Sequence, residues 1–178
     1  MQEFEGWDSF YLIVGAAAGA LIGLQFVVMT LIADQPRQPQ AMAGNAFATP
    51  TIVHFSVSLW LCALVRTPWW SVTPFAVLAG VTGILGSVYS IVVIRRMRMQ
   101  TTYTPELQDW LFYAGLPIVG YGFLLAASIT AKPNITIALY AVAASSLLLL
   151  FLGIHNAWDT VTYHVFLEET EGRVGEDT

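Results

Sequence analysis

Charge is scarce in this chain. Asp, Glu, Lys and Arg make up only 11% of its 178 residues, against about 25% in soluble domains. Apolar residues make up 56%, and the mean hydropathy is +0.65. A disordered chain needs low hydrophobicity and high net charge, and a soluble domain needs a polar surface. The composition excludes both classes and indicates an integral membrane protein.

Cysteine and basic residues are also few. Cys62 is the single cysteine, so the chain cannot be a secreted module held together by intrachain disulfides. Seven Lys and Arg residues stand against twelve Asp and Glu, which gives a net charge of -5. An acidic chain repels a phosphate backbone, and we therefore expect no nucleic-acid partner.

Long apolar runs are abundant instead. About 20 such residues cross the hydrocarbon of a bilayer. The shorter run 51–65 contains one titratable side chain, His54. We predict an all-α bundle of five transmembrane helices in one domain, residues 1–168, followed by an acidic, disordered tail at 169–178. If 51–65 is instead a re-entrant hairpin, the chain has four passes. The other predicted spans are 10–33, 72–94, 110–130 and 134–154, with the last helix extending to about 167.

The distribution of basic residues predicts the orientation. Short cytoplasmic loops hold the excess of Lys and Arg in membrane proteins. With five spans, Arg66 and Lys132 fall on one side and the remaining five basic residues on the other. This favours a multi-pass protein of the cell membrane with its N-terminus outside and its C-terminus in the cytoplasm. The five are Arg37, Arg95, Arg96, Arg98 and Arg173.

Three of these arginines follow the third apolar run directly. Arg95, Arg96 and Arg98 suit the anchoring role that positive residues have at the cytoplasmic boundary. The alternative is binding of anionic lipid headgroups, to which each basic residue adds about 1 kcal/mol. In both cases the partner of this cluster is the lipid bilayer.

Small residues predict where helices approach closely. Gly15, Gly19 and Gly23 are spaced by four and share one helix face. The run 72–94 has a second such face. We expect these two helices to pair within the chain, and the alternative is a contact with a second copy in a homo-oligomer. The second face contains Gly80, Gly83 and Gly86.

Polar residues inside the spans are the candidate functional residues, because they are costly in lipid. They gather in the cytoplasmic halves and predict a vestibule open to the cytoplasm. His155 and Asp159 are four apart and share a helix face, where the carboxylate can fix one imidazole tautomer. They form either a proton or ligand site or a helix end that satisfies its polar groups at the headgroups. The candidate residues are Gln25, His54, His155, Asn156 and Asp159.

His54 lies at a depth similar to that of His155, and this allows a shared site. Two histidines with Asp159 could bind a divalent metal, and two histidines on different helices could bind haem. The alternative is a histidine that is hydrogen-bonded to a neighbouring helix. No His-Glu-x-x-His, Cys-x-x-Cys or P-loop motif is present, so we assign no catalytic residue and no metal ligand, and the cofactor is unknown.

Together these features favour a small transport or channel-type bundle that takes a small solute or an ion. One alternative is a haem- or metal-binding membrane subunit. Another is a non-catalytic helical partner of another membrane protein. An enzyme is the least favoured class, because the sequence pairs no nucleophile with a base.

Overall fold

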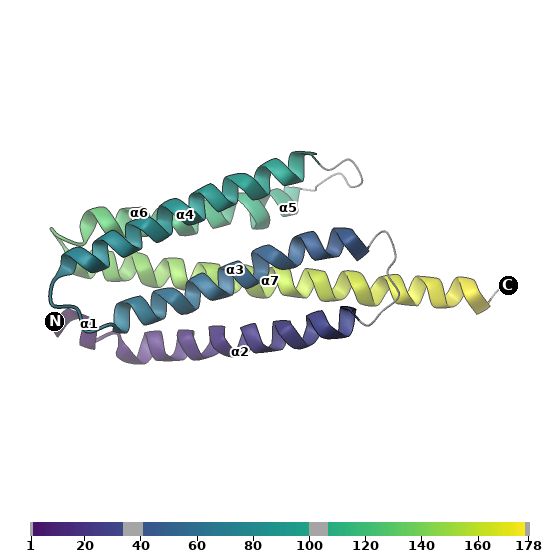
Figure 1. Ribbon diagram of the computed structural model, residues 1–178, viewed down its shortest axis with the longest axis horizontal. Coiled ribbons are helices and arrows are strands. Elements are labelled where there is room, and N and C mark those ends of the chain that lie inside the picture. Colours follow the sequence, from purple (N-terminus) through teal and green to yellow (C-terminus); the bar gives the residue numbers. More distant parts are fainter. Residues whose placement is uncertain (1, 34–40, 100–106, 177–178) are drawn as a thin grey trace.

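A computed structural model describes residues 2–33, 41–99 and 107–176, with the side chains of 3–31, 49–99 and 107–162. Figure 1 shows a bundle of long helices whose N- and C-termini lie at opposite ends. No strand occurs within the described ranges. The elements are α1 (Gln2–Glu5), α2 (Asp8–Ala33), α3 (Ala41–Arg66), α4 (Val72–Met99), α5 (Leu107–Trp110), a π-helical turn η1 (Leu111–Gly115), α6 (Leu116–Thr130) and α7 (Ile135–Glu176).

Five of these helical segments are long and apolar enough to cross a membrane. The prediction of an all-α bundle with five spans is thereby confirmed. The segment predicted at 51–65 belongs to one continuous helix, α3, and is not a hairpin. That helix begins ten residues earlier than predicted, at Ala41, and passes through Pro50. A proline is tolerated in a membrane helix where neighbouring groups satisfy the freed backbone.

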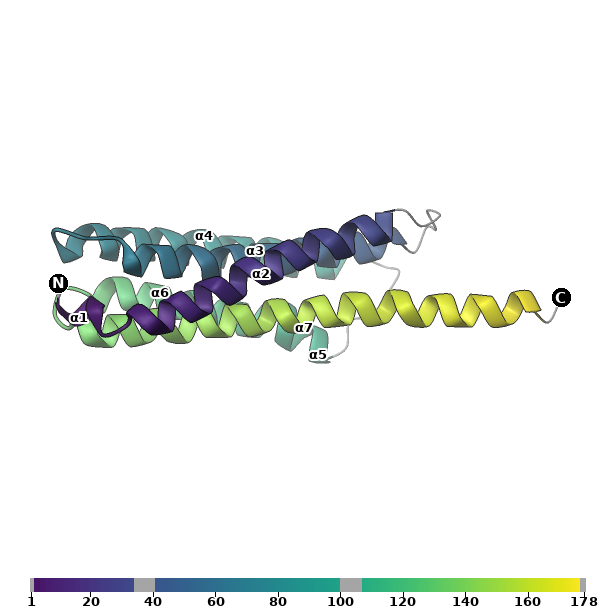
Figure 2. The ribbon, with the colours of Figure 1, turned by 90° about the horizontal axis from the view of Figure 1, so that it is seen from below.

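The last helix is longer than the sequence predicts. Helix α7 has 42 residues, which corresponds to about 63 Å at 1.5 Å per residue. The hydrocarbon of a bilayer is only about 30 Å thick. Its C-terminal part therefore extends beyond the other helices, as Figures 1 and 2 both show. The helix continues to Glu176, so residues 169–176 are helical where we expected a disordered tail.

The helices are packed in an order that differs from their order in the chain. Helix α3 contacts α2 on one side and α7 on the other, and α6 contacts both α7 and α4. Figure 1 shows α2 and α4 at opposite edges of the bundle. The interior is consequently formed by α3, α6 and α7.

The expected pairing of the two glycine-rich helices is wrong. The glycine face of α4 meets α6, since a Cβ at Gly83 would lie 2.9 Å from Leu125. On α2 only Gly15 is covered, with Cys62 of α3 at 3.1 Å from such a Cβ, while Gly19 and Gly23 have nothing within 4 Å. Residues four apart are displaced by about 40° around a helix. Successive glycines therefore turn away from the line along which α2 contacts α3. Three of the four buried side chains in the described part of α2 follow a step of seven instead, Tyr11, Ala18 and Gln25, and the fourth is Val14, one turn after Tyr11.

We predict opposite outcomes for two of these glycines. A leucine at Gly15 must displace Cys62, and such overpacking typically costs about 1–3 kcal/mol. A leucine at Gly19 meets open space and leaves the thermal stability of the monomer unchanged. Thermal melting in detergent, with the particle mass measured alongside, tests both. A lower mass for Gly19→Leu at unchanged stability would identify the open face as an interface between copies.

The turn before α6 is π-helical. Pro117 lacks an N–H and its ring clashes with the carbonyl four residues earlier, so the sequence predicts a kinked helix here. The backbone widens just before the proline: the N–H of Leu116 donates to the carbonyl of Leu111, five residues back. Such turns are frequent at functional sites. In this π-helical turn, Phe112 and Tyr113 lie near His155 and Asp159 of α7.

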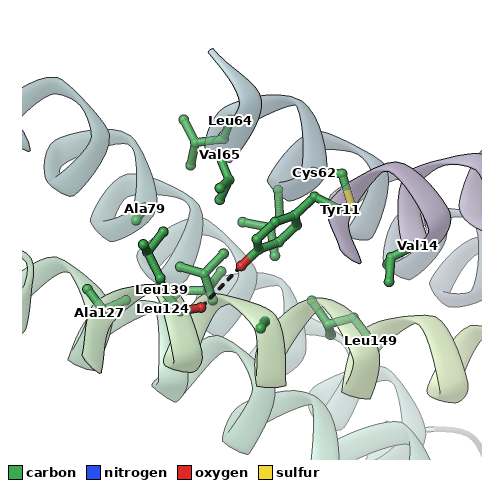
Figure 3. Packing of buried hydrophobic residues seen from close by; sticks show 14 of the residues in the cluster. Tyr11, Val14, Cys62, Leu64, Val65, Ala79, Leu124, Ala127, Leu139 and Leu149 are labelled. Carbon is green, nitrogen blue, oxygen red and sulfur yellow. Dashed lines mark hydrogen bonds between the residues drawn. The ribbon is translucent and has the colours of Figure 1, made fainter. Parts of the chain in front are cut away.

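Aromatic side chains close the end of the bundle where the N-terminus lies. Phe4 of α1 packs edge-on against Phe75 with ring centroids 5.3 Å apart, and Trp7 packs against Tyr140 at 4.8 Å. Figure 3 shows the Tyr11 hydroxyl donating to the carbonyl of Leu139, at 3.1 Å. These aromatic contacts fill the end of the bundle at which α1 lies.

The arrangement makes the orientation testable. The described basic residues lie at both ends, with Arg66 and Lys132 near the N-terminus and Arg95, Arg96 and Arg98 at the far end of α4. We predict that reporters fused to the two termini report opposite compartments, with the C-terminus in the cytoplasm. Substituting the three arginines of α4 with glutamine is expected to weaken that preference. A cytoplasmic N-terminus would contradict the prediction.

Candidate functional site

A stripe of buried polar side chains runs along α3. Thr51, His54 and Ser58 follow a spacing of three and four, which places them on one face of the helix. Their exposed fractions are 0%, 2% and 0%. This face points into the interior between α3, α6 and α7. Polar groups are costly in that position and are retained where they bond across helices or serve a pathway.

His54 is bonded to a second helix. Its Nδ1 lies 3.3 Å from the Tyr121 hydroxyl of α6. Tyr121 is fully buried because its ring covers Gly86 of α4. The sequence offered no signal for this partner, since a single tyrosine in an apolar run reads as a packing residue.

Serines continue the polar stripe toward the middle of the bundle. The Ser58 hydroxyl donates to the carbonyl of Ser146 on α7, at 3.0 Å. Ser145 beside it is fully buried, and its hydroxyl has no hydrogen-bond partner among the described residues. An unsatisfied hydroxyl in an apolar setting costs free energy of about 1–3 kcal/mol.

Asn156 is a further buried residue whose side-chain polar atoms lack partners within the described ranges. Its side chain is fully buried, and neither Nδ2 nor Oδ1 has a hydrogen-bond partner in the described part of the chain. The Thr160 hydroxyl donates to the backbone carbonyl of Asn156, at 2.9 Å, and not to its side chain. An amide buried without partners costs about 2–7 kcal/mol, depending on the reference state. Such a cost is uncommon in a native protein, and a buried group left in this state requires an explanation.

His155 lies where the π-helical turn meets α7. The Phe112 ring stacks on the imidazole with centroids 3.6 Å apart and planes 5° apart. Gln108 Nε2 lies 3.3 Å from His155 Nε2. An amide nitrogen can only donate, so in this contact His155 Nε2 has the role of acceptor. His155 Nδ1 lies 3.3 Å from Asp159 Oδ2 but outside hydrogen-bond geometry.

The environment of Asn156 follows from the helix geometry. On one side of it, Gly153 lies against the Phe55 ring of α3. On the other side, Asp159 lies near the buried Tyr113 of η1. Because residues are about 100° apart around a helix, Asn156 points into the angle between α3 and η1. This side chain therefore belongs to the same interior as the stripe on α3.

The two histidines have separate partners. His54 bonds to Tyr121 inside the bundle, whereas His155 is held by Gln108 and Phe112 at its end. Among the residues that the structure describes, no three His, Cys, Asp or Glu side chains are grouped so that they could hold a metal. His54, His155 and Asp159 consequently do not form the metal triad that the sequence allows.

The remaining predicted residues have other positions. Gln25 is buried on α2. Arg95 and Arg96 are exposed, and the Arg98 guanidinium lies over the Trp110 ring, 5.7 Å from its centroid. Sequence reasoning missed the residues that surround the predicted ones, because their positions depend on helix packing: Thr51, Gln108, Phe112, Tyr113, Tyr121 and Ser145.

We call six of the buried side chains of this interior the polar file. They lie in the half of the bundle farther from the aromatic end, with Ser58 and Ser145 innermost. The file consists of Thr51, His54, Ser58, Tyr121, Ser145 and Asn156. No protein-family model, curated protein or solved structure matches this chain.

Proposed function

We propose that this membrane protein is a small transport-type bundle, and that its solute enters the polar file from the end marked by His155 and Asp159. The observation that carries the proposal is the buried Asn156 amide, whose polar atoms lack partners among the described residues. A purely structural helix gains nothing from such a group, whereas a pathway needs polar groups that are free to bind what passes.

The two ends of the bundle differ in a way that supports entry of the solute from the end at which His155 and Asp159 lie. The His155 and Asp159 side chains are 24% and 39% exposed, so they can meet solvent or headgroups. The aromatic residues at the opposite end are packed against one another. With the C-terminus in the cytoplasm, as the arginines favour, the file opens toward the cytoplasm of a cell-membrane protein.

The test uses purified protein in liposomes. We predict that it raises the permeability to protons or to small uncharged solutes above that of protein-free vesicles. Ser58→Leu places a bulky apolar group in the file and abolishes the increase. Ser56→Leu changes an exposed residue of the same helix and serves as the matched control. Equal permeability with and without the protein would contradict the proposal, and so would equal loss in both variants.

The open part of the α2 glycine face favours a second candidate function, the docking of another helix. Gly19 and Gly23 have nothing within 4 Å of an added Cβ, and small residues let a second backbone approach closely. A second copy of this chain is the occupant we propose, which gives a homo-oligomer. The particle mass of Gly19→Leu, described above, decides between this contact and lipid.

A further inference from the structure

The site at Asn156 also indicates what kind of solute the bundle takes. We propose that Asn156 binds a small uncharged molecule that carries a hydrogen-bond donor and an acceptor side by side, as carboxamides and urea do. This inference rests on the proposed transport function and specifies its substrate class. It is carried by the chemistry of the free amide and by the placement of charge around it.

The Asn156 amide presents complementary groups to such a molecule. Its Nδ2 can donate two hydrogen bonds and its Oδ1 can accept two. Both atoms are buried without a partner among the described residues. A ligand with an adjacent N–H and C=O pairs with both atoms at once and leaves neither unsatisfied. A ligand with acceptors alone, such as an inorganic anion, would satisfy only Nδ2.

The charges around the site disfavour ions of both signs. Asp159 and the nearby Asp109 of α5 lie beside the entrance and repel an anion. Deeper in the file the ionisable side chains are His54 and Tyr121, which bond to each other. A cation that passes Asp159 therefore meets no carboxylate among the file residues. Transfer of an uncompensated ion into such an interior is far more costly than transfer of a neutral polar molecule.

A serine hydroxyl deeper in the bundle offers a second group that can both donate and accept hydrogen bonds. The Ser145 hydroxyl is buried without a partner in the described part of the chain, and it lies three turns before Asn156 on α7. A hydroxyl can both donate and accept. A solute released by Asn156 thus meets a second neutral group of mixed character rather than a charge.

The experiment measures urea entry into liposomes containing the purified full-length chain, by stopped-flow light scattering. The protein-dependent rate is expected to fall by at least about tenfold in Asn156→Leu, because two hydrogen bonds are lost at roughly a factor of three to ten each. Thr162→Val is the matched control. Thr162 lies on the same helix, and its hydroxyl bonds to the carbonyls of Trp158 and Asp159. Its rate is expected to equal that of the unmodified chain.

Each outcome has one meaning. If the chain conducts protons, measured with an enclosed pH dye, but does not accelerate urea entry, the inference is overturned and the proposed function stands. If it conducts neither, the proposed function fails as well. Should Asn156→Leu not fold, as judged by helicity and particle mass, Asn156→Ser replaces it with a small polar residue that membrane helices tolerate. A urea rate unchanged in a folded variant would also overturn the inference.

Discussion

Replacing Gly86 with alanine is expected to destabilise the bundle by about 1–3 kcal/mol or more, the range measured for overpacked cores. The added Cβ would overlap the Tyr121 ring. Neither side can yield easily, since Tyr121 is fully buried and its hydroxyl is held by His54. The two helices must separate, or the ring must leave its place.

Gly122→Ala is the control for this change. Gly122 lies on α6, beside Tyr121, and has nothing within 4 Å of an added Cβ. Alanine is the better helix former by about 0.5–1 kcal/mol, so this variant should be neutral or slightly stabilised. Thermal unfolding followed by circular dichroism compares the two. Equal midpoints would show that α4 and α6 do not approach as closely as described.

The contrast between these glycines shows what could be predicted from the sequence. Hydropathy predicted the five spans, because it shows how long and how apolar each segment is. It does not predict the direction in which a side chain points around its helix. Gly86 and Gly19 lie in similar small-residue patterns, yet one is covered by Tyr121 and the other is open.

The same limit applies to the candidate site. The spacing of His155 and Asp159 predicts a shared face, because an interval of four residues is a local property of the helix. The partners of His54 and His155 come from other helices and depend on the packing order of α3, α7 and α6. That order depends on glycines and on the turn before Pro117, whose effects act through tertiary contacts. The polar file could therefore be recognised only once the helices were placed.

A double-mutant cycle on His54 and Tyr121 is expected to give the largest coupling in the interior. Each single change, His54→Leu or Tyr121→Phe, leaves the other polar group buried without its partner. Such an orphan costs about 1–3 kcal/mol of folding free energy. Replacing both partners with apolar groups removes the orphan, so the double variant should lose clearly less than the sum of the two.

The same variants also show whether the bond between His54 and Tyr121 only stabilises the bundle or also takes part in solute passage. If the pair only holds α3 against α6, the double variant recovers stability and keeps the permeability measured in liposomes. If it belongs to the polar file, the double variant recovers stability but not permeability, because the neutral polar groups between Asn156 and Ser58 are gone. We predict the second result. Additive losses of stability would contradict the 3.3 Å contact between His54 and Tyr121 itself, since independent sites add and bonded ones do not.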